Sequence, residues 1–226
     1  IGEAMTPKLD PLAIAVQILS ERDPRLGEVI ARVGPCGLGI PRSEAHYSSR
    51  AYFESLAAAI VGQQLSAKAA ATIFSRVRAL GPDPSVFPSP AELLAIPEPT
   101  LRAAGLSAAK VTSVRDLAGR VVRGELHLDS LEAMDDDAVI EELCMVKGIG
   151  RWTAEMFLMF RLGRLDVLPV ADLGIQKGIQ RLFNCRKRPS PDRMRVLTRA
   201  WRPYRSVACW YLWRLPELDA KPAKER

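Results

Sequence analysis

The sequence predicts an all-α fold, and three observations support this prediction. Apolar residues recur at helical spacing through most of the 226 residues, and segments with the strict alternation of a strand are scarce. Glycine and proline stand between the periodic segments, where helices end. Hydrophobic residues make up 48% and charged residues 26%, which excludes a disordered or collagen-like chain and supplies a packed core.

Each predicted helix has its own start or stop signal. The pattern over 52–80 forms one long helix with a candidate break at Gly62, and the Gly-Pro-Asp-Pro segment 81–84 ends it. Gly105 and Gly124 end later helices, and an acidic first turn suits the helix that begins at 135. In chain order the predicted helices are 11–19, 24–33, 52–80, 91–96, 99–104, 108–123, 135–146, 151–162, 173–183, 192–201 and 203–215.

Basic residues concentrate near one end of the chain. The formal net charge is +6, but residues 181–226 carry +9 and the first 180 residues carry −3. This asymmetry favours a polyanion as partner, with nucleic acid ahead of a membrane, and a solvated basic tail is the alternative. No apolar run approaches the ~18 residues that span a bilayer, and no secretory signal is visible, so we expect a cytoplasmic protein.

The few cysteines and histidines exclude several kinds of site. Cys36, Cys144, Cys185 and Cys209 are far apart, which argues against a zinc site or an iron–sulfur cluster and for reduced thiols. With only two histidines, a histidine-based metal site or catalytic triad is not expected either.

The most specific motif is the segment 143–154, Leu-Cys-Met-Val-Lys-Gly-Ile-Gly-Arg-Trp-Thr-Ala. Gly148 and Gly150 flank one apolar residue, Ile149, between two amphipathic helices. Such a turn leaves unpaired N–H groups at the positive end of the second helix, where a phosphate can bind. A plain glycine-rich turn is the alternative for Gly-x-Gly alone, but the longer pattern, with Ile149 pointing inward, is far more specific.

This segment resembles the helix-hairpin-helix of the DNA glycosylase superfamily, whose motif continues through a Gly/Pro-rich loop to an aspartate. Here the continuation is Leu-Pro-Val-Ala-Asp at 168–172. Residues 59–66 and 201–213 are similar to the 3-methyladenine DNA glycosylase II (AlkA-type) branch. The resemblance covers 52–213 and implies a compact, monomeric form without the N-terminal β-domain of longer members.

The resemblance also implies how the chain is organised. We expect two helical lobes around a DNA-binding cleft. One lobe would combine 5–51 with 173–226, and the central lobe would be 52–172, with the hairpin at 143–154 and the Gly/Pro-Asp loop at 163–172.

Asp172 is the predicted catalytic residue. It opens a predicted helix, so an N-cap aspartate is the simpler interpretation of the residue by itself. Cleavage of an N-glycosidic bond, however, builds positive charge on the deoxyribose, and an ionised carboxylate stabilises that charge and directs water to C1′. The family resemblance assigns this role to the aspartate that matches Asp172.

The four tryptophans all lie after residue 150, and the resemblance assigns base stacking to one of them, Trp213. Trp152 is the second candidate for the base pocket, and Met156 stands where some relatives have a pocket tyrosine. A cationic methylated base gains about 0.5–2 kcal/mol from each aromatic face it contacts. Trp201 and Trp210 are expected in the core.

A wedge must fill the space that a flipped base leaves, and the matching region is 63–66. Gln64 is the aligned wedge residue and Leu65 the second choice, while an exposed polar turn is the alternative. Bifunctional relatives carry a Schiff-base lysine two residues after the second hairpin glycine. Trp152 occupies that position here, which predicts an enzyme without strand-cleaving activity.

The hairpin is expected to contact a DNA phosphate. No cofactor is expected to be required for the reaction. The resemblance implies a monovalent cation, Na⁺ or K⁺, held by backbone carbonyls near Cys144, Val146 and Ile149. The residues expected at the phosphate are Lys147, Gly148, Ile149, Gly150, Arg151 and Trp152.

Together these features predict a monofunctional DNA glycosylase of base excision repair that works on duplex DNA at a bacterial nucleoid. Its substrates would be alkylated purines such as 3-methyladenine and 7-methylguanine, flipped out of the duplex, and its product an abasic site. A glycosylase with another lesion range, a non-catalytic helix-hairpin-helix DNA-binding module and a helical adaptor remain alternatives.

Overall fold

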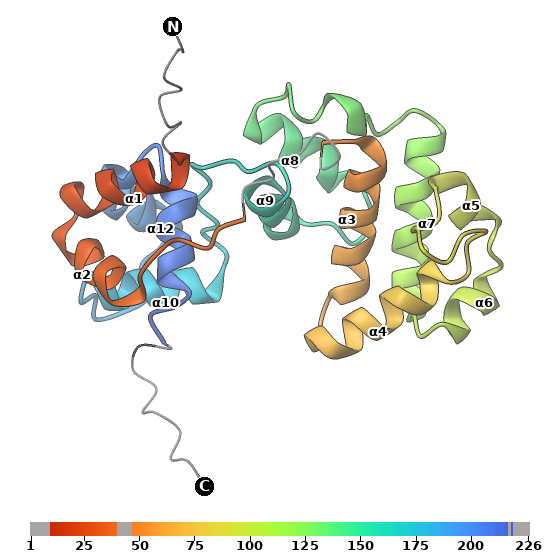
Figure 1. The fold of residues 1–226 in the computed structure, drawn as a ribbon, viewed down its shortest axis with the longest axis horizontal. Helices are drawn as coiled ribbons and strands as arrows, with labels where there is room; N and C mark the ends of the chain where they lie inside the picture. Colours follow the sequence, from red (N-terminus) through yellow and green to blue (C-terminus); the bar gives the residue numbers. More distant parts are fainter. Residues whose placement is uncertain (1–9, 40–46, 217, 219–226) are drawn as a thin grey trace, which may run out of the picture. The chain divides into compact units, whose positions relative to one another are not determined.

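Every regular element in the described part of the chain is helical (Figure 1), which confirms the all-α prediction. The computed structural model describes residues 10–39, 47–216 and 218. None of the helices in these ranges is long and apolar enough to cross a membrane.

The chain forms two compact units. Unit 1 joins the chain up to 39 with the chain from 164 onward, and unit 2 is the segment 40–163. The helices of unit 1 are α1 (Pro11–Arg22), α2 (Pro24–Val33), α10 (Leu173–Leu182), α11 (Pro191–Leu197), the 3-10 helix η3 (Arg199–Trp201) and α12 (Arg205–Leu212). The helices of unit 2 are α3 (Ser49–Gly62), α4 (Ala67–Arg78), α5 (Pro90–Ala95), α6 (Glu98–Ala103), α7 (Ala108–Val122), the 3-10 helix η2 (Leu128–Ser130), α8 (Asp136–Cys144) and α9 (Arg151–Phe160).

These bounds differ from the predicted ones at both junctions. The loop 164–172, which the sequence places in a central lobe 52–172, belongs to unit 1, and residues 47–51 belong to unit 2. Tertiary hydrogen bonds explain the first difference, since Ser206 at the start of α12 donates to the carbonyl of Arg164 and accepts from the N–H of Val167. These bonds join residues about forty positions apart, so helical periodicity carries no sign of them.

Unit 1 is organised around α12, whose side chains are almost all buried. The buried Trp201, in η3, donates from its indole N–H to Asp23, at 2.9 Å, and Asp23 also caps α2. Trp210 is 7% exposed, with the guanidinium of Arg214 stacked over its ring. Both tryptophans are therefore core residues, as expected.

In unit 2, α3 packs against α4, α7 and α9 (Figure 1). The buried face of α3 carries Tyr52, Phe53, Leu56 and Ile60. The candidate break near Gly62 is confirmed: α3 ends there, and Ser66 caps α4 by accepting from the N–H of Ala69. The predicted helix 192–201 is divided into α11 and η3, and the predicted helix 203–215 is shorter, as α12.

Candidate active site

Asp172 is the N-cap of α10, and one of its carboxylate oxygens accepts two hydrogen bonds. Oδ1 accepts from the backbone N–H of Ile175 at 2.8 Å and from the indole Nε1–H of Trp213 at 3.0 Å. Asp172 is half-buried, as is Trp213. The two leading site residues, 41 positions apart, are thus brought together within unit 1, and the capping interpretation of Asp172 is correct without excluding a catalytic one.

The contact between Asp172 and Trp213 depends on two glycines of α10. A Cβ at Gly174 would lie 2.8 Å from Cδ1 of Trp213 and 3.1 Å from Oδ1 of Asp172. One helical turn later, a Cβ at Gly178 would lie 2.9 Å from Cβ of Leu212. Both distances are shorter than packed atoms allow, so α12 can approach α10 only where side chains are missing.

If Asp172 has the catalytic role that the family resemblance implies, Gly174→Ala is expected to lower the rate of base release about 10- to 100-fold, because the new methyl group pushes the indole away from the carboxylate and small misplacements in a site are costly. The rate is measured in single turnover on duplex DNA with one alkylated purine. Gly39→Ala is the matched control in unit 1, since a Cβ there meets nothing within 4 Å. Equal rates for the two variants would show that the Asp172–Trp213 contact is unimportant for the reaction.

The loop that leads to Asp172 is anchored on the start of α12. Besides the bonds from Ser206, the guanidinium of Arg205 binds both carboxylate oxygens of Asp166, at 2.7 and 2.8 Å, and the Asp166 carbonyl. A bidentate pair of this kind fixes geometry as well as charge. Asp172 is therefore held from two sides, by its own helix and by a loop that is tied to α12.

The hairpin has the turn geometry that its glycines predict. Gly148 has a φ of +84°, a conformation that favours glycine, and the N–H of Ile149 donates to the carbonyl of Val146 at 3.0 Å. Val146 and Ile149 are buried, so the expectation that Ile149 points inward is confirmed. Because Gly150 is the N-cap of α9, no side chain caps this helix, whereas Asp135 caps α8.

Among the hairpin side chains, Lys147 is exposed, but Arg151 is engaged within unit 2. Nε of Arg151 lies 3.1 Å from the buried carboxylate of Glu155, and its guanidinium is also 3.5 Å from Asp137. Ile149 is buried, so only its backbone could meet a phosphate. The phosphate contacts predicted for residues 147–152 stay a prediction: the side chains of Lys147 and Arg151 reach the surface, while the N–H groups of Lys147 and Ile149 already have partners within unit 2.

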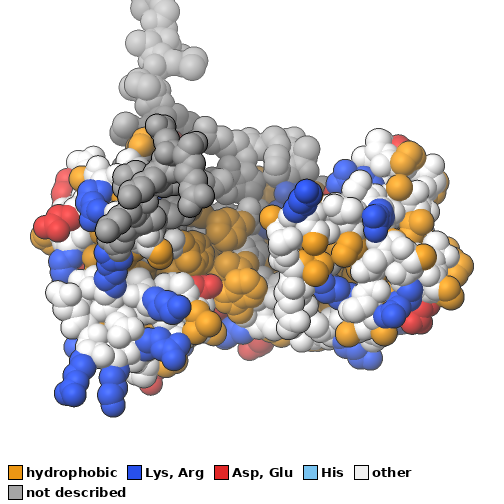
Figure 2. Space-filling view, turned by 90° about the horizontal axis from the view of Figure 1, so that it is seen from below, with side chains coloured by type: hydrophobic (Ala, Val, Ile, Leu, Met, Phe, Trp, Pro, Cys, Tyr) orange, Lys and Arg blue, Asp and Glu red, His pale blue; other side chains and the backbone are white. Residues whose placement is uncertain are grey.

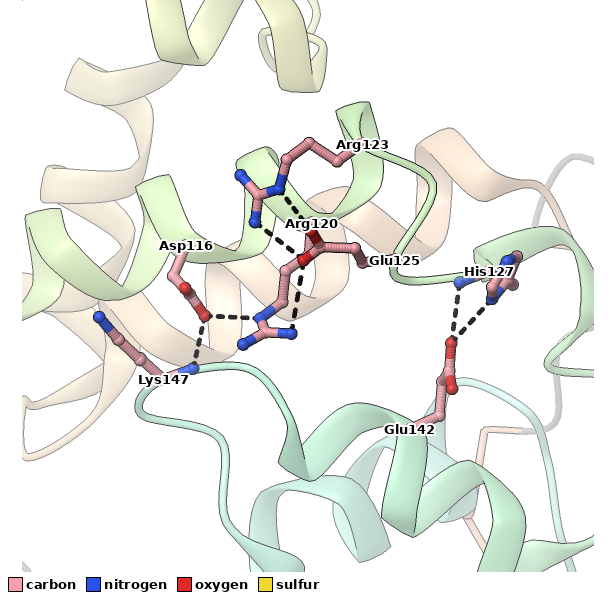
Figure 3. Close-up of polar contacts among 7 residues, drawn as sticks. All are labelled: Asp116, Arg120, Arg123, Glu125, His127, Glu142 and Lys147. Atoms are coloured by element: carbon pink, nitrogen blue, oxygen red, sulfur yellow. Dashed lines mark hydrogen bonds and ion pairs between the residues drawn. The ribbon is translucent and has the colours of Figure 1, made fainter.

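The backbone of Lys147 is held by α7. Its N–H donates to Oδ2 of Asp116 at 2.9 Å, and the same oxygen accepts from Nε of Arg120 at 3.0 Å (Figure 3). Burial alone would raise the pKa of the Asp116 carboxyl, but the Lys147 N–H and the Arg120 guanidinium outweigh it and keep this pKa below its usual range. The Asp116 side chain is therefore ionised at neutral pH, and it accepts the hydrogen bond from the Lys147 N–H of the hairpin in this form.

The other two predicted pocket residues lie on α9, in unit 2. Trp152 is 46% exposed in the first turn, and Met156, one turn later, is half-buried. This spacing puts them on the same side of the helix.

Within the part of the chain that the structure describes, no group of three or more His, Cys, Asp or Glu side chains could hold a metal ion.

Gln64 and Leu65 form the exposed turn between α3 and α4. Gln64 has a φ of +57°, which is uncommon outside glycine, and the side chain of Leu65 is 39% exposed. The preceding residue, Gln63, is tied to the hairpin, because its Nε2 donates to the carbonyl of Gly148 at 2.7 Å. The two wedge candidates are therefore presented at the surface beside the hairpin.

Basic side chains cover the C-terminal part of unit 1, and Figure 2 shows many Lys and Arg side chains on this unit's visible face (left). Most of the predicted positive charge is thus at the surface, although Arg195 pairs there with Asp192 and Arg202 with Asp166. The exposed basic residues of this part are Lys177, Arg181, Arg186, Lys187, Arg188, Arg193, Arg195, Arg199 and Arg202.

Sequence reasoning missed the residues that support the site rather than form it. Gly174 and Gly178 could have been found from their spacing, since two glycines one turn apart on a helix indicate close approach of another element. Lys110 and Asp116 carried no comparable signal, because their partners are backbone groups far along the chain.

Comparison with known proteins identifies the family of this chain. Residues 57–203 match the family described as HhH-GPD superfamily base excision DNA repair protein. The alkylbase DNA glycosidase-like protein mag2 of Schizosaccharomyces pombe is 31% identical over 204 residues, which cover 90% of this chain and 93% of that protein. DNA-3-methyladenine glycosylase 1 of the same yeast is 36% identical over 177 residues, 77% of each chain.

A solved structure leads to the same family. The 3-methyladenine DNA glycosylase Mag1 of Schizosaccharomyces pombe, in complex with abasic DNA, superposes with a TM-score of 0.75 and 34% identity over 91% of this chain and 98% of that one. The family match at 57–203 includes the hairpin and the loop that ends at Asp172. The chain belongs to the HhH-GPD superfamily of base excision DNA repair proteins.

Proposed function

We propose that this protein is a monofunctional DNA glycosylase that hydrolyses the N-glycosidic bond of alkylated purines in duplex DNA and leaves an abasic site. The observation that carries the proposal is the hydrogen bond between Trp213 and Asp172, which places an aromatic ring beside a carboxylate. A non-catalytic DNA-binding module would need neither residue. The names of relatives, among them DNA-3-methyladenine glycosylase 1, support the same reaction class and substrates.

The reaction separates a base from C1′ of its deoxyribose. As the bond to the base lengthens, positive charge develops on the sugar, and the carboxylate of Asp172 stabilises it and directs a water molecule to C1′. A 3-methylated or 7-methylated purine is already cationic, so it leaves without a strong general acid. Uncharged lesions such as hypoxanthine would react more slowly for the same reason.

The base pocket is proposed to use an aromatic side chain. Trp213, beside Asp172 in unit 1, stacks on the flipped base. Stacking on a cation is favoured by the negative face of an indole ring, which gives selectivity for alkylated over normal purines.

DNA binding is proposed to rest on three features. The N–H groups at the uncapped start of α9 bind one phosphate, the turn at Gln64 and Leu65 enters the stack, and the exposed basic residues of unit 1 follow the backbone. The carbonyl of Val146 accepts one hydrogen bond, from Ile149, and retains a lone pair. Carbonyls near Cys144, Val146 and Ile149 therefore suit Na⁺ or K⁺, whose charge would face the same phosphate.

The proposal is tested by measuring base release from duplexes that carry one methylated, deaminated or oxidised base. We expect free 3-methyladenine and 7-methylguanine, an abasic product and no strand cleavage. Treatment of the enzyme–DNA mixture with borohydride is expected to trap no covalent adduct, because Trp152 stands where bifunctional relatives have lysine. A trapped adduct would refute the monofunctional reaction, and binding without base release from any lesion would favour the DNA-binding module.

A further inference from the structure

One side of α7 contacts two turns of unit 2, the one that carries the wedge candidates and the one in the hairpin. The proposed function assigns these turns to different steps, entry into the base stack and phosphate binding. Lys110, Ser113 and Asp116 follow one another at intervals of three residues, so they lie along one side of the helix over about 9 Å. All three are half-buried, while Val114 and Leu117 face the core. We call these three residues the positioning row, residues 63–66 the wedge turn and residues 147–150 the hairpin turn.

Lys110 fixes the end of α3, where the wedge turn begins. Its Nζ donates to the carbonyl of Val61 at 2.7 Å and to the carbonyl of Gln63 at 2.8 Å. These carbonyls lie at the helix C-terminus, where intrahelical donors run out and a positive charge is favourable. Lys110 therefore determines the place from which the chain leaves α3 toward Gln64 and Leu65.

Ser113 and Asp116 fix the hairpin turn in the same way. A Cβ at Gly148 would lie 2.6 Å from Oγ of Ser113, so the hairpin backbone is in direct contact with α7 at this point. One step further along the row, Asp116 accepts from the N–H of Lys147 (Figure 3). The hairpin turn is thus seated on α7 by a close contact and a charge-assisted hydrogen bond.

Gln63 connects the two turns directly. Its carbonyl accepts from Lys110 and its side chain donates to the carbonyl of Gly148 at 2.7 Å. The next residue, Gln64, has a φ of +57°, a conformation that persists only where neighbouring contacts hold it. The row and Gln63 together leave the wedge turn little freedom to move relative to the hairpin turn.

We propose that Lys110, Ser113 and Asp116 are positioning residues that keep the wedge turn in register with the phosphate-binding hairpin turn, so that the wedge enters the base stack at the nucleotide that the hairpin grips. The inference rests on the proposed function. Base steps are only about 3.4 Å apart, so a small displacement of either turn would direct the wedge to the wrong step.

The test compares one lesion in two settings: paired in a duplex, and unpaired opposite an abasic-site analogue. Flipping is costly for a paired base and least costly for an unpaired one. Lys110→Met is therefore expected to slow single-turnover base release about tenfold from the paired site and less than about twofold from the unpaired one. Lys110→Arg should restore most of the paired rate, because it can still donate to both carbonyls.

Arg115→Met is the matched control. Arg115 lies on the same helix and donates to the carbonyl of Ile96 at 3.0 Å, away from both turns. Its loss removes the same kind of contact without touching the row. We expect Arg115→Met to change the rates from the paired and the unpaired site equally. A second readout is the fluorescence of 2-aminopurine placed next to the lesion, which rises when the base stack opens. This rise on binding should be as large for Arg115→Met as for the wild type, and smaller for Lys110→Met.

The outcomes are distinct. Lys110→Met could lower the rates of base release from the paired and the unpaired site equally, and this would refute the positioning role of the row. The role would also be refuted if Arg115→Met changed the ratio of the two rates as much as Lys110→Met does. Should Lys110→Met fail to fold, Gln63→Met removes the link to Gly148 and carries the same expectation. If the wild type releases no base, the proposed function fails by itself, and the 2-aminopurine signal still decides whether the row positions the wedge turn.

Discussion

Asp172→Asn is expected to lower the single-turnover rate of base release about 100- to 1,000-fold, because it removes the negative charge that opposes the developing positive charge on the sugar. Asparagine is also a good N-cap, and its side-chain oxygen can accept from the N–H groups of Ile175 and Trp213 as the carboxylate does. The thermal unfolding midpoint should therefore change little.

This variant separates the two roles of the residue. A purely structural N-cap predicts no change in rate, whereas a catalytic carboxylate predicts a large loss with intact folding. Affinity for duplex DNA that contains an abasic-site analogue is the control, and it should remain within about threefold of the wild-type value, well under the 1.4 kcal/mol of a tenfold change. A rate close to that of the wild type would remove Asp172 from the mechanism.

Trp213→Phe is expected to lower the rate about 10- to 100-fold, the equivalent of the 1.5–3 kcal/mol that a hydrogen bond to a charged group is worth. Phenylalanine keeps an aromatic face for the base but has no N–H for Oδ1 of Asp172. Affinity for abasic-analogue DNA should fall far less than the rate, since the flipped base is missing from that ligand.

The double variant shows through which residue Trp213 acts. If its N–H works by orienting the carboxylate, then Trp213→Phe should have a much smaller effect on the Asp172→Asn background than on the wild type. Equal fold-losses on both backgrounds would mean that Trp213 contributes stacking alone. Single-turnover rates for the four proteins are sufficient to distinguish these outcomes.

Most of the helices follow from local chemistry that can be read along the chain. The predicted segment 24–33 matches α2, and 108–123 matches α7 to within one residue, because apolar spacing and capping residues act over a few positions. The predicted helix 203–215 is too long at both ends, since α12 begins only at Arg205 and ends at Leu212. Apolar residues continue past its end because they pack against other helices of unit 1, which periodicity does not distinguish from a longer helix.

The hairpin is the part of the candidate site that the sequence by itself determined. Its glycines, its buried Ile149 and the uncapped start of α9 all lie within a few consecutive residues, so backbone conformation and local hydrogen bonding decide their geometry. The same holds for Asp172 as an N-cap, which depends only on the residues that follow it.

Only the tertiary structure decided which residues act together. Trp213 reaches Asp172 across 41 positions because Gly174 and Gly178 let α12 approach α10, and Lys110 and Asp116 hold two turns through backbone carbonyls and N–H groups. Every residue has such backbone groups, so a sequence cannot show which of them a side chain will bind. The physical reason is therefore one of range: capping and periodicity are local, whereas close packing and side-chain-to-backbone contacts exist only once the chain is folded.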